Sequence, residues 1–296
     1  MNDKNGDALE FNLDRARQLA RDTLMEDVGQ GDITSRILVP PDEECTGVIT
    51  VKEPAVLCGV EVAREVFEIA MVENGVARDR LVFDCRASDG EKLAAGTVIA
   101  EVRGNARAVL MAERTVLNFL QHLSGVATIT RQFVDEVEKV SRVTRIFDTR
   151  KTMPLMRYLQ KYAVRCGGGS NHRMGLWDMV LVKDNHHKIY QNGNMIEEIR
   201  KNLPAGVRVQ VEVDRVSELK GLLMDRVDIV LLDNMSASQI AEAVKIIKGR
   251  CEIEVSGGVN LKNVREIAKL GVDRISIGAL THSVKAVDMG MEVTGL

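Results

Sequence analysis

The sequence predicts an α/β protein in which a small mixed α/β domain precedes an incomplete parallel β/α barrel. Two observations support the barrel. After Val143, six short runs rich in β-branched residues alternate with helical segments. A polar or small residue stands near the carboxyl end of each run, and the last five of these residues are 21 to 29 positions apart. One strand, one helix and two loops fit that spacing, which is the repeating unit of a parallel barrel.

The mixed domain is predicted over residues 1–117, joined by residues 283–296. Its first helix places Leu13, Ala16, Ala20 and Leu24 on one face. The glycines in the segment 29–32 end this helix, and the residues after them alternate like a strand up to position 51. A helix over 61–72 and strands over 81–83 and 97–102 complete the domain, with a turn at 88–90 between the strands.

A long helical stretch over 106–140 leads into the barrel, which is predicted to span 118–282. We expect an interruption of this helix near Ser124 and Gly125, since both residues are poor helix formers. Only six strand-like runs follow, so the barrel should lack part of the usual eightfold ring. The runs cover 144–148, 179–182, 208–213, 227–232, 252–255 and 274–277.

Composition excludes several classes of protein. The 296-residue chain has a formal net charge of −3 and 3% aromatic residues, which argues against a nucleic-acid partner. Its five cysteines are scattered and odd in number, which predicts reduced thiols in the cytoplasm with no disulfide framework or zinc site. The sequence shows no secretory signal, and no uncharged apolar run approaches the roughly 20 residues of a membrane span.

One segment, residues 144–187, concentrates positive charge. It contains eight Lys and Arg residues against three Asp, although the whole chain is acidic. A local excess of this kind indicates an anionic ligand bound at one place. The charges fall in the segments DTRKT at 148–152, GGGSNHRMG at 167–175 and KDNH at 183–186. The helix expected between the first two, with Arg157, Tyr158, Lys161 and Arg165, is interpreted as having an exposed basic face.

Two acids and two glycine loops follow along the later strands. Glu212 and Asp233 stand where neighbouring strands should end, and carboxylates there could accept ligand hydroxyls and hold a divalent cation. The alternative is that each caps the next helix. The loops should bind phosphate through backbone N–H groups and through a helix expected to begin near Leu261, although glycine also simply permits turns. Their residues are Ser256, Gly257 and Gly258 in the first, and Ile277, Gly278 and Ala279 in the second.

These segments, in this order, resemble the quinolinate phosphoribosyltransferase family, and the resemblance extends from residue 27 to residue 283. It implies an N-terminal α/β sandwich followed by an open barrel. It also implies a pentosyltransferase of NAD biosynthesis. Such an enzyme converts quinolinate and phosphoribosyl pyrophosphate into nicotinate mononucleotide, CO₂ and diphosphate, with Mg²⁺ bound mainly through the diphosphate of the substrate.

The resemblance assigns roles to individual residues. It places Arg150, His172, Arg173 and Lys183 around quinolinate, with Thr149 in the same shell and Lys151 near the sugar phosphate. It assigns catalysis to Lys151, Lys183, Glu212 and Asp233. It also implies that Arg114 acts across the interface of a homodimer or higher homo-oligomer with shared active sites. Taken singly, each of these residues could equally be a solvated loop residue or a structural hydrogen bonder.

One departure from the family keeps other functions open. The family has Thr-Thr-Pro-Gly after the Arg-Lys pair, whereas here Thr152 is followed by Met153, Pro154, Leu155 and Met156. A molybdenum-associated paralogue with a different substrate is therefore one alternative. The second is a barrel aldolase that forms a Schiff base through Lys183 or Lys151. The third is a nucleotide-binding regulator without catalysis. The lack of GxxxxGK[ST] and GxGxxG motifs argues against an ATPase and a Rossmann oxidoreductase.

Overall fold

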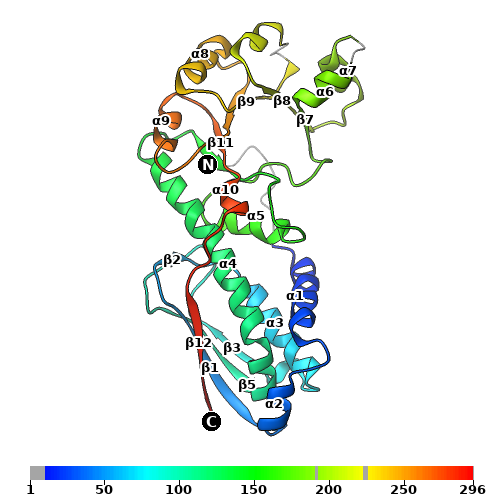
Figure 1. Cartoon of the computed structure of the whole chain (residues 1–296), viewed down its shortest axis with the longest axis vertical. Coiled ribbons are helices and arrows are strands. Elements are labelled where there is room, and N and C mark those ends of the chain that lie inside the picture. The colour runs from blue at the N-terminus through cyan, green and yellow to red at the C-terminus, as the bar shows by residue number, and fades with distance from the viewer. Residues whose placement is uncertain (1–10, 191–192, 223–225, 296) are drawn as a thin grey trace. The chain divides into compact units, whose positions relative to one another are not determined.

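The computed structural model describes residues 11–190, 193–222 and 226–295, which form two compact units (Figure 1). The first unit comprises the chain up to Ile129, residues Pro154–Gly167 and the segment from Val284 onward. The second comprises Thr130–Met153 and Gly168–Ser283. The domain bounds predicted from the sequence, 1–117 with 283–296 and 118–282, stay a prediction. Among the described residues, no helix combines the length and the apolar character that a membrane span needs.

The first unit is built on a four-stranded antiparallel sheet in the order β12-β1-β5-β3. Strand β1 buries every second residue from Cys45 to Val51, which is the alternation that the sequence predicts. The last strand pairs with β1, so the end of the chain returns to the first sheet. The strands are β1 Glu44–Val51, β3 Val82–Cys85, β5 Val98–Asn105 and β12 Met289–Gly295; the short strands β2 Ala55–Val56 and β4 Lys92–Leu93 pair separately.

Helices α1 Leu13–Val28 and α3 Val60–Glu73 pack against each other in this unit. The apolar face predicted for α1 is confirmed, since Ala16, Ala20 and Leu24 are buried. The strand-like interpretation is confirmed for 44–51 but wrong for 33–38. Residues Ile33–Leu38 form helix α2, because the Asp32 carboxylate accepts the Ser35 N–H at 3.0 Å and thereby caps the helix. A short 3₁₀ helix spans Arg78–Arg80.

Helix α4, Ala106–Glu138, runs for 33 residues without a break. The interruption predicted near Ser124 and Gly125 is therefore wrong, and the packing inside the first unit explains both residues. The Ser124 hydroxyl accepts the Cys58 N–H at 3.0 Å. A Cβ atom on Gly125 would lie 2.4 Å from the Lys285 carbonyl oxygen, so a glycine is needed where the C-terminal segment approaches the helix.

The second unit contains six parallel strands in the order β6-β11-β10-β9-β8-β7. The six predicted strands and their parallel arrangement are confirmed. The strands are β6 Arg145–Phe147, β7 Met179–Val182, β8 Arg208–Val213, β9 Ile229–Asp233, β10 Glu252–Ser256 and β11 Arg274–Ser276. The connecting helices are α6 Asp184–Ile189, α7 Met195–Asn202, a 3₁₀ helix at Val216–Gly221, α8 Ala237–Ile247, α9 Val264–Lys269 and α10 Ala279–His282.

Helix α5, Arg157–Cys166, belongs to the first unit and corrects one prediction. Its interpretation as a helix with an exposed basic face is wrong, because Lys161 is fully buried and Tyr158 is nearly so. Next to them, the Gln160 amide nitrogen lies 2.9 Å from His122 Nε2. A lysine buried in this way shows that charge pattern alone did not identify the solvent-facing side of this helix.

Candidate active site

The predicted site residues of the second unit gather because parallel strands end at the same edge of their sheet. Strand β6 is followed by Thr149, Arg150 and Lys151, and β7 is followed by Lys183. Strand β8 carries Glu212, while β9 and β10 end at Asp233 and Ser256. Ile277 and Gly278 follow β11, and Ala279 is the first residue of α10. Arg114 is exposed on the part of α4 that belongs to the first unit.

Arg150 and Arg173 concentrate positive charge in one place. The pKa of Arg173 is lowered, mainly because the side chain is partly buried and then because the positive charge of Arg150 acts on it, while Asp178 opposes the change. The guanidinium of Arg173 is held by one hydrogen bond from Nη1 to the Met179 carbonyl, at 3.1 Å. Two guanidinium groups that repel each other are stabilised by an anion between them, and a planar carboxylate suits their forked geometry.

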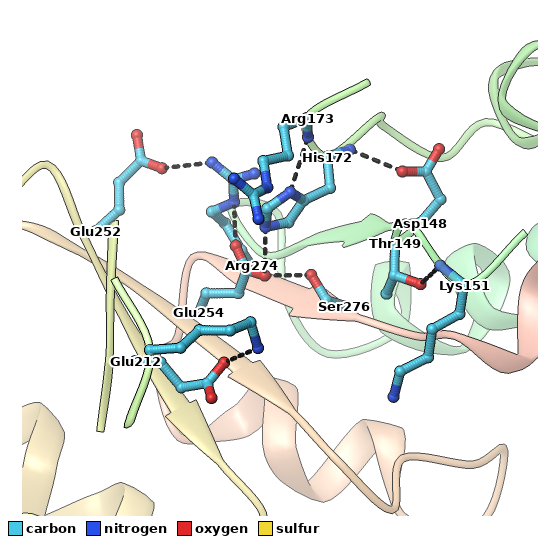
Figure 2. Close-up of polar contacts among 11 residues, drawn as sticks. Asp148, Thr149, Lys151, His172, Arg173, Glu212, Glu252, Glu254, Arg274 and Ser276 are labelled. Atoms are coloured by element: carbon cyan, nitrogen blue, oxygen red, sulfur yellow. Dashed lines mark hydrogen bonds and ion pairs between the residues drawn. The ribbon is translucent and has the colours of Figure 1, made fainter. Parts of the chain in front are cut away.

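Lys183 and Glu212 form an ion pair between the ends of β7 and β8, with 2.6 Å between Nζ and Oε2 (Figure 2). The glutamate is largely buried, whereas nearly half of the lysine side chain is exposed. The sequence prediction assigned Lys183 to quinolinate and Glu212 to ligand hydroxyls and a cation. The ion pair brings the two residues together at this strand edge, and their roles stay a prediction.

Three carboxylates form an acidic cluster, which we define as Glu212, Asp214 and Asp233. One oxygen of each lies within 4.8 Å of the others, so the cluster has the ligand type and spacing for a divalent cation. Asp214 was missed in the sequence, although the Glu-Val-Asp spacing at 212–214 puts both acids on one side of an extended chain. The alternative that Asp233 caps the next helix is wrong, because Ser236 is the N-cap of α8.

The loop after β10 lies so close to Asn234 that it requires a glycine at position 257. A Cβ atom on Gly257 would lie 2.1 Å from Oδ1 and 2.9 Å from the backbone nitrogen of Asn234, and its φ of +91° also favours glycine. The helix predicted to begin near Leu261 begins instead at Val264 and has six residues. The N-terminus of this helix is therefore further along the chain from Gly258 than the sequence suggested.

The loop after β11 lies against Lys151. A Cβ atom on Gly278 would lie 3.1 Å from Cδ of Lys151, so the absence of a side chain lets the lysine pass close to this loop. The Thr281 hydroxyl donates a hydrogen bond to the Lys151 carbonyl at 2.8 Å. The Lys151 N–H also donates to the Thr149 hydroxyl at 3.0 Å. A cationic side chain beside a glycine loop suits a phosphate group.

Contacts with Asp148, Arg173 and Glu254 hold His172 in place (Figure 2). Its backbone N–H donates to Asp148 at 2.8 Å, and its Nδ1 accepts the Arg173 N–H at 2.7 Å. Its Nε2 lies 3.3 Å from a carboxylate oxygen of Glu254. Since Nδ1 is an acceptor, the ring proton is on Nε2 and faces Glu254. Both ring nitrogens are engaged, which indicates that His172 positions Arg173; its predicted contact with quinolinate stays a prediction.

The sequence analysis did not predict a buried ionic network that contacts His172. Glu254 is 1% exposed and Arg274 is 6% exposed. The two form an ion pair with 2.9 Å between Nε of Arg274 and Oε2 of Glu254. The N–H of Arg274 is not aligned for a hydrogen bond with that oxygen. Ser276 donates a hydrogen bond to Glu254, and the Arg274 guanidinium carbon lies 3.8 Å from the centre of the Phe147 ring. Burial raises the pKa of Glu254, but the contacts with His172, Arg274 and Ser276 outweigh burial and lower it to about 2.

Comparison with protein families identifies both parts of the chain. Residues 32–124 match the N-terminal domain of quinolinate phosphoribosyl transferase, and residues 126–292 match its C-terminal domain. The chain is 42% identical over 287 residues to a probable nicotinate-nucleotide pyrophosphorylase (carboxylating) from Methanocaldococcus jannaschii, covering 95% of this chain and 98% of that protein. It is 40% identical over 287 residues to the corresponding enzyme of Mycobacterium leprae, with the same coverage.

Solved structures agree with these matches. The nicotinate-nucleotide pyrophosphorylase of Francisella tularensis is 38% identical with a TM-score of 0.86, over 98% of this chain and 100% of that one. NadC from Streptococcus pyogenes is 34% identical with a TM-score of 0.88, over 98% of this chain and 100% of that one. The similarity therefore covers the fold from end to end.

Proposed function

The chain belongs to the quinolinate phosphoribosyl transferase family, and we propose that it transfers the phosphoribosyl group of phosphoribosyl pyrophosphate to quinolinate with loss of CO₂. The products are nicotinate mononucleotide, diphosphate and CO₂, and the reaction is a step of NAD biosynthesis. We expect the reaction in the cytoplasm, where the scattered cysteines would stay reduced.

The observation that carries this proposal is the partly buried guanidinium of Arg173, on which the positive charge of Arg150 acts. Quinolinate bears two adjacent carboxylates on a planar ring, and two neighbouring guanidinium groups match a planar dianion. Lys183 follows β7, the next strand along the chain, and its ammonium group is paired with Glu212. When the dianion binds, its negative charge relieves the repulsion between the two arginines. The site should therefore bind a substrate with both carboxylates more tightly than one with a single carboxylate.

The reaction then depends on positioning and electrostatics. The quinolinate nitrogen attacks C1 of the ribosyl group as the bond from C1 to the diphosphate oxygen breaks, and the electron pair leaves with diphosphate. The ring is now a pyridinium, so the bond to the 2-carboxylate can break with its electron pair left on C2. That carbon takes up a proton, and CO₂ departs. Lys151 and the two glycine loops would hold the phosphates, and Glu212 and Asp233 would face the ribose as positive charge develops on it.

Mg²⁺ is the metal that the family resemblance implies, and the acidic cluster fits it. Glu212, Asp214 and Asp233 supply oxygen ligands, which Mg²⁺ prefers, within 4.8 Å of one another. When bound with the diphosphate, the ion would neutralise the charge that develops on the leaving group. The carboxylates themselves orient the ribose hydroxyls, and Glu212 also holds the ammonium group of Lys183.

We also propose that the working unit is at least a homodimer with shared active sites. Arg114 is exposed on α4, where a second subunit could use it. Helix α2 of the same unit exposes Ile33, Ile37 and Leu38, each at 74%. A cluster of large apolar side chains in water favours burial against a partner chain, and twofold pairing is the commonest arrangement.

The test is incubation of the purified chain with quinolinate, phosphoribosyl pyrophosphate and Mg²⁺, with mass analysis for nicotinate mononucleotide. Nicotinate, which lacks the 2-carboxylate, serves as the matched control substrate and should release no CO₂. Stoichiometric release of CO₂ and diphosphate with quinolinate supports the proposal. Binding of phosphoribosyl pyrophosphate by folded protein without any product would favour a regulator or a paralogue with another substrate. Trapping of a carbonyl substrate by borohydride would favour an aldolase.

A further inference from the structure

Two thiols and a carboxylate meet in the first unit, where the proposed transferase reaction uses none of them. Cys58 lies just before α3, Asp89 lies in the turn between β3 and β4, and Cys166 is the last residue of α5. The two sulfur atoms and one carboxylate oxygen lie within 4.8 Å of one another. Cys58 is fully buried, while the other two residues are partly exposed, so the cluster has a side open to solvent.

The backbone around this cluster is fixed by the fold. The Gly90 N–H donates to the Leu57 carbonyl at 2.8 Å, which ties the turn of Asp89 to the segment of Cys58. The Cys58 N–H is held by the Ser124 hydroxyl of α4 at 3.0 Å. A Cβ atom on Gly90 would lie 3.4 Å from the Cys166 carbonyl oxygen, so the turn packs directly on the end of α5. Side chains held by such rigid elements are suited to bind an ion with defined geometry.

Asp89 caps a helix, but only one of its two carboxylate oxygens takes part in that cap. Its Oδ1 accepts the N–H groups of Gly59 and Val60, at 2.9 and 3.1 Å, and so caps the start of α3. Its Oδ2 accepts the hydroxyl of Tyr162 at 3.0 Å, which orients the carboxylate. Helix capping accounts for neither the two thiols beside Asp89 nor the tyrosine one turn before Cys166.

The donor set of the cluster suits a cation. Two thiolates and a carboxylate are anionic ligands, and a divalent cation between the three groups would compensate their charge. Thiolate ligands select soft or borderline cations such as zinc over Mg²⁺ and Ca²⁺, which prefer oxygen.

We propose that Cys58, Asp89 and Cys166 bind one zinc ion, with Tyr162 orienting the carboxylate and a water molecule completing the tetrahedron. The ion joins three segments of the first unit, the loop before α3, the β3–β4 turn and α5. Its role is to stabilise this unit, and it is separate from the acidic cluster proposed for Mg²⁺.

The experiment uses the full chain, reduced and freed of metal with a chelator, and Co²⁺ as a spectroscopic substitute for zinc. Co²⁺ is expected to produce a near-ultraviolet thiolate-to-cobalt charge-transfer band that saturates at one ion per chain and disappears when zinc is added. Zinc should also raise the unfolding temperature of the wild-type chain. Cys166→Ser should abolish the band and the thermal shift. Cys85→Ser is the matched control, since Cys85 is a half-buried thiol of the same unit outside the cluster.

Three outcomes would overturn the proposal. The first is a cobalt spectrum without the thiolate band. The second is a Cys166→Ser variant that binds zinc as tightly as the wild type. The third is air oxidation of the metal-free chain to a Cys58–Cys166 disulfide with no zinc binding in the reduced form. Asp89→Asn can be tested as well. Because this change also disturbs the cap of α3, its unfolding temperature is compared with that of the metal-free wild type. The Cys166→Ser variant decides whether the cluster binds zinc.

Discussion

Replacing Glu254 with glutamine tests whether the buried ionic network supports the fold and the site. The change keeps the shape of the side chain but removes its negative charge. Arg274, which is 6% exposed, then loses its buried partner, and among the described residues it keeps Glu252, at 3.4 Å, and the Phe147 ring. The new amide group also carries an N–H₂ donor. Its neighbours His172 and Ser276 are donors themselves, so they cannot accept a hydrogen bond from it in their present orientation.

The magnitude follows from two independent estimates. Removing one partner of a buried ion pair costs about 3–5 kcal/mol, because the other charge is left uncompensated. The pKa of Glu254 falls from its ordinary 4.5 to about 2, and at ~1.36 kcal/mol per pKa unit this corresponds to about 3 kcal/mol. We therefore expect Glu254→Gln to lose about 3 kcal/mol of unfolding free energy at neutral pH.

The measurement is urea unfolding of the wild type and the variant from pH 7 downward. A carboxyl group with a lowered pKa stabilises the folded state above its unfolded pKa, and this contribution is lost as pH falls through the folded value. The difference between the two proteins should therefore be complete above roughly pH 5 and should shrink toward pH 2.

Glu252→Gln is the matched control for this measurement, since Glu252 is on the same strand with a side chain that is 35% exposed. We expect it to cost about 1 kcal/mol or less, because solvent screens its ion pairs. Equal losses in the two variants, or a loss for Glu254→Gln that does not change with pH, would refute the reasoning.

Three further predictions concern the site. Arg173→Ala should reduce the affinity for quinolinate by roughly 10- to 150-fold, equivalent to about 1.5–3 kcal/mol, with little change in stability; unchanged affinity in calorimetric titration would remove this residue from the site. Asp214→Asn and Asp233→Asn should raise the Mg²⁺ concentration needed for half-maximal rate and leave quinolinate binding unchanged, whereas the opposite pattern would reverse the assignment of the acidic cluster. A mixture of inactive Arg114→Ala and inactive Lys183→Ala subunits should regain part of the activity, and if subunits exchange without any recovery, Arg114 does not act across an interface.

Much of the fold could be predicted because it follows from local periodicity. The β-branched runs from 144 to 277 repeat with the length of a strand, a helix and two loops, and six strands appear where the pattern places them. The burial of Ala16, Ala20 and Leu24 likewise follows from a helical period of 3.6 residues. Local signals failed where a residue is required by packing against a segment far away in the sequence. Gly125 was predicted to interrupt α4, but its lack of a side chain instead makes room for the C-terminal segment.

The grouping of polar residues at the strand ends was predictable for a related reason. Residues at the carboxyl ends of parallel strands come together in any such sheet, so Arg150, Lys183, Glu212 and Asp233 could be grouped before their contacts were known. The contacts themselves could not be inferred. The Lys183–Glu212 ion pair depends on the adjacency of β7 and β8, and Asp214 joins the acidic cluster only because its carboxylate turns toward Asp233.

The sequence by itself determined the order of the strands along the chain, the strand ends that carry polar groups and the concentration of positive charge on residues 144–187. Only the tertiary structure decided which ionisable groups are buried and what neutralises them. Glu254 and Arg274 meet because β10 and β11 are neighbours in the sheet, and Cys58 and Cys166 meet because α5 packs within the first unit. A local pattern reflects the period of one element, whereas the free energy of a buried charge depends on partners that other elements supply.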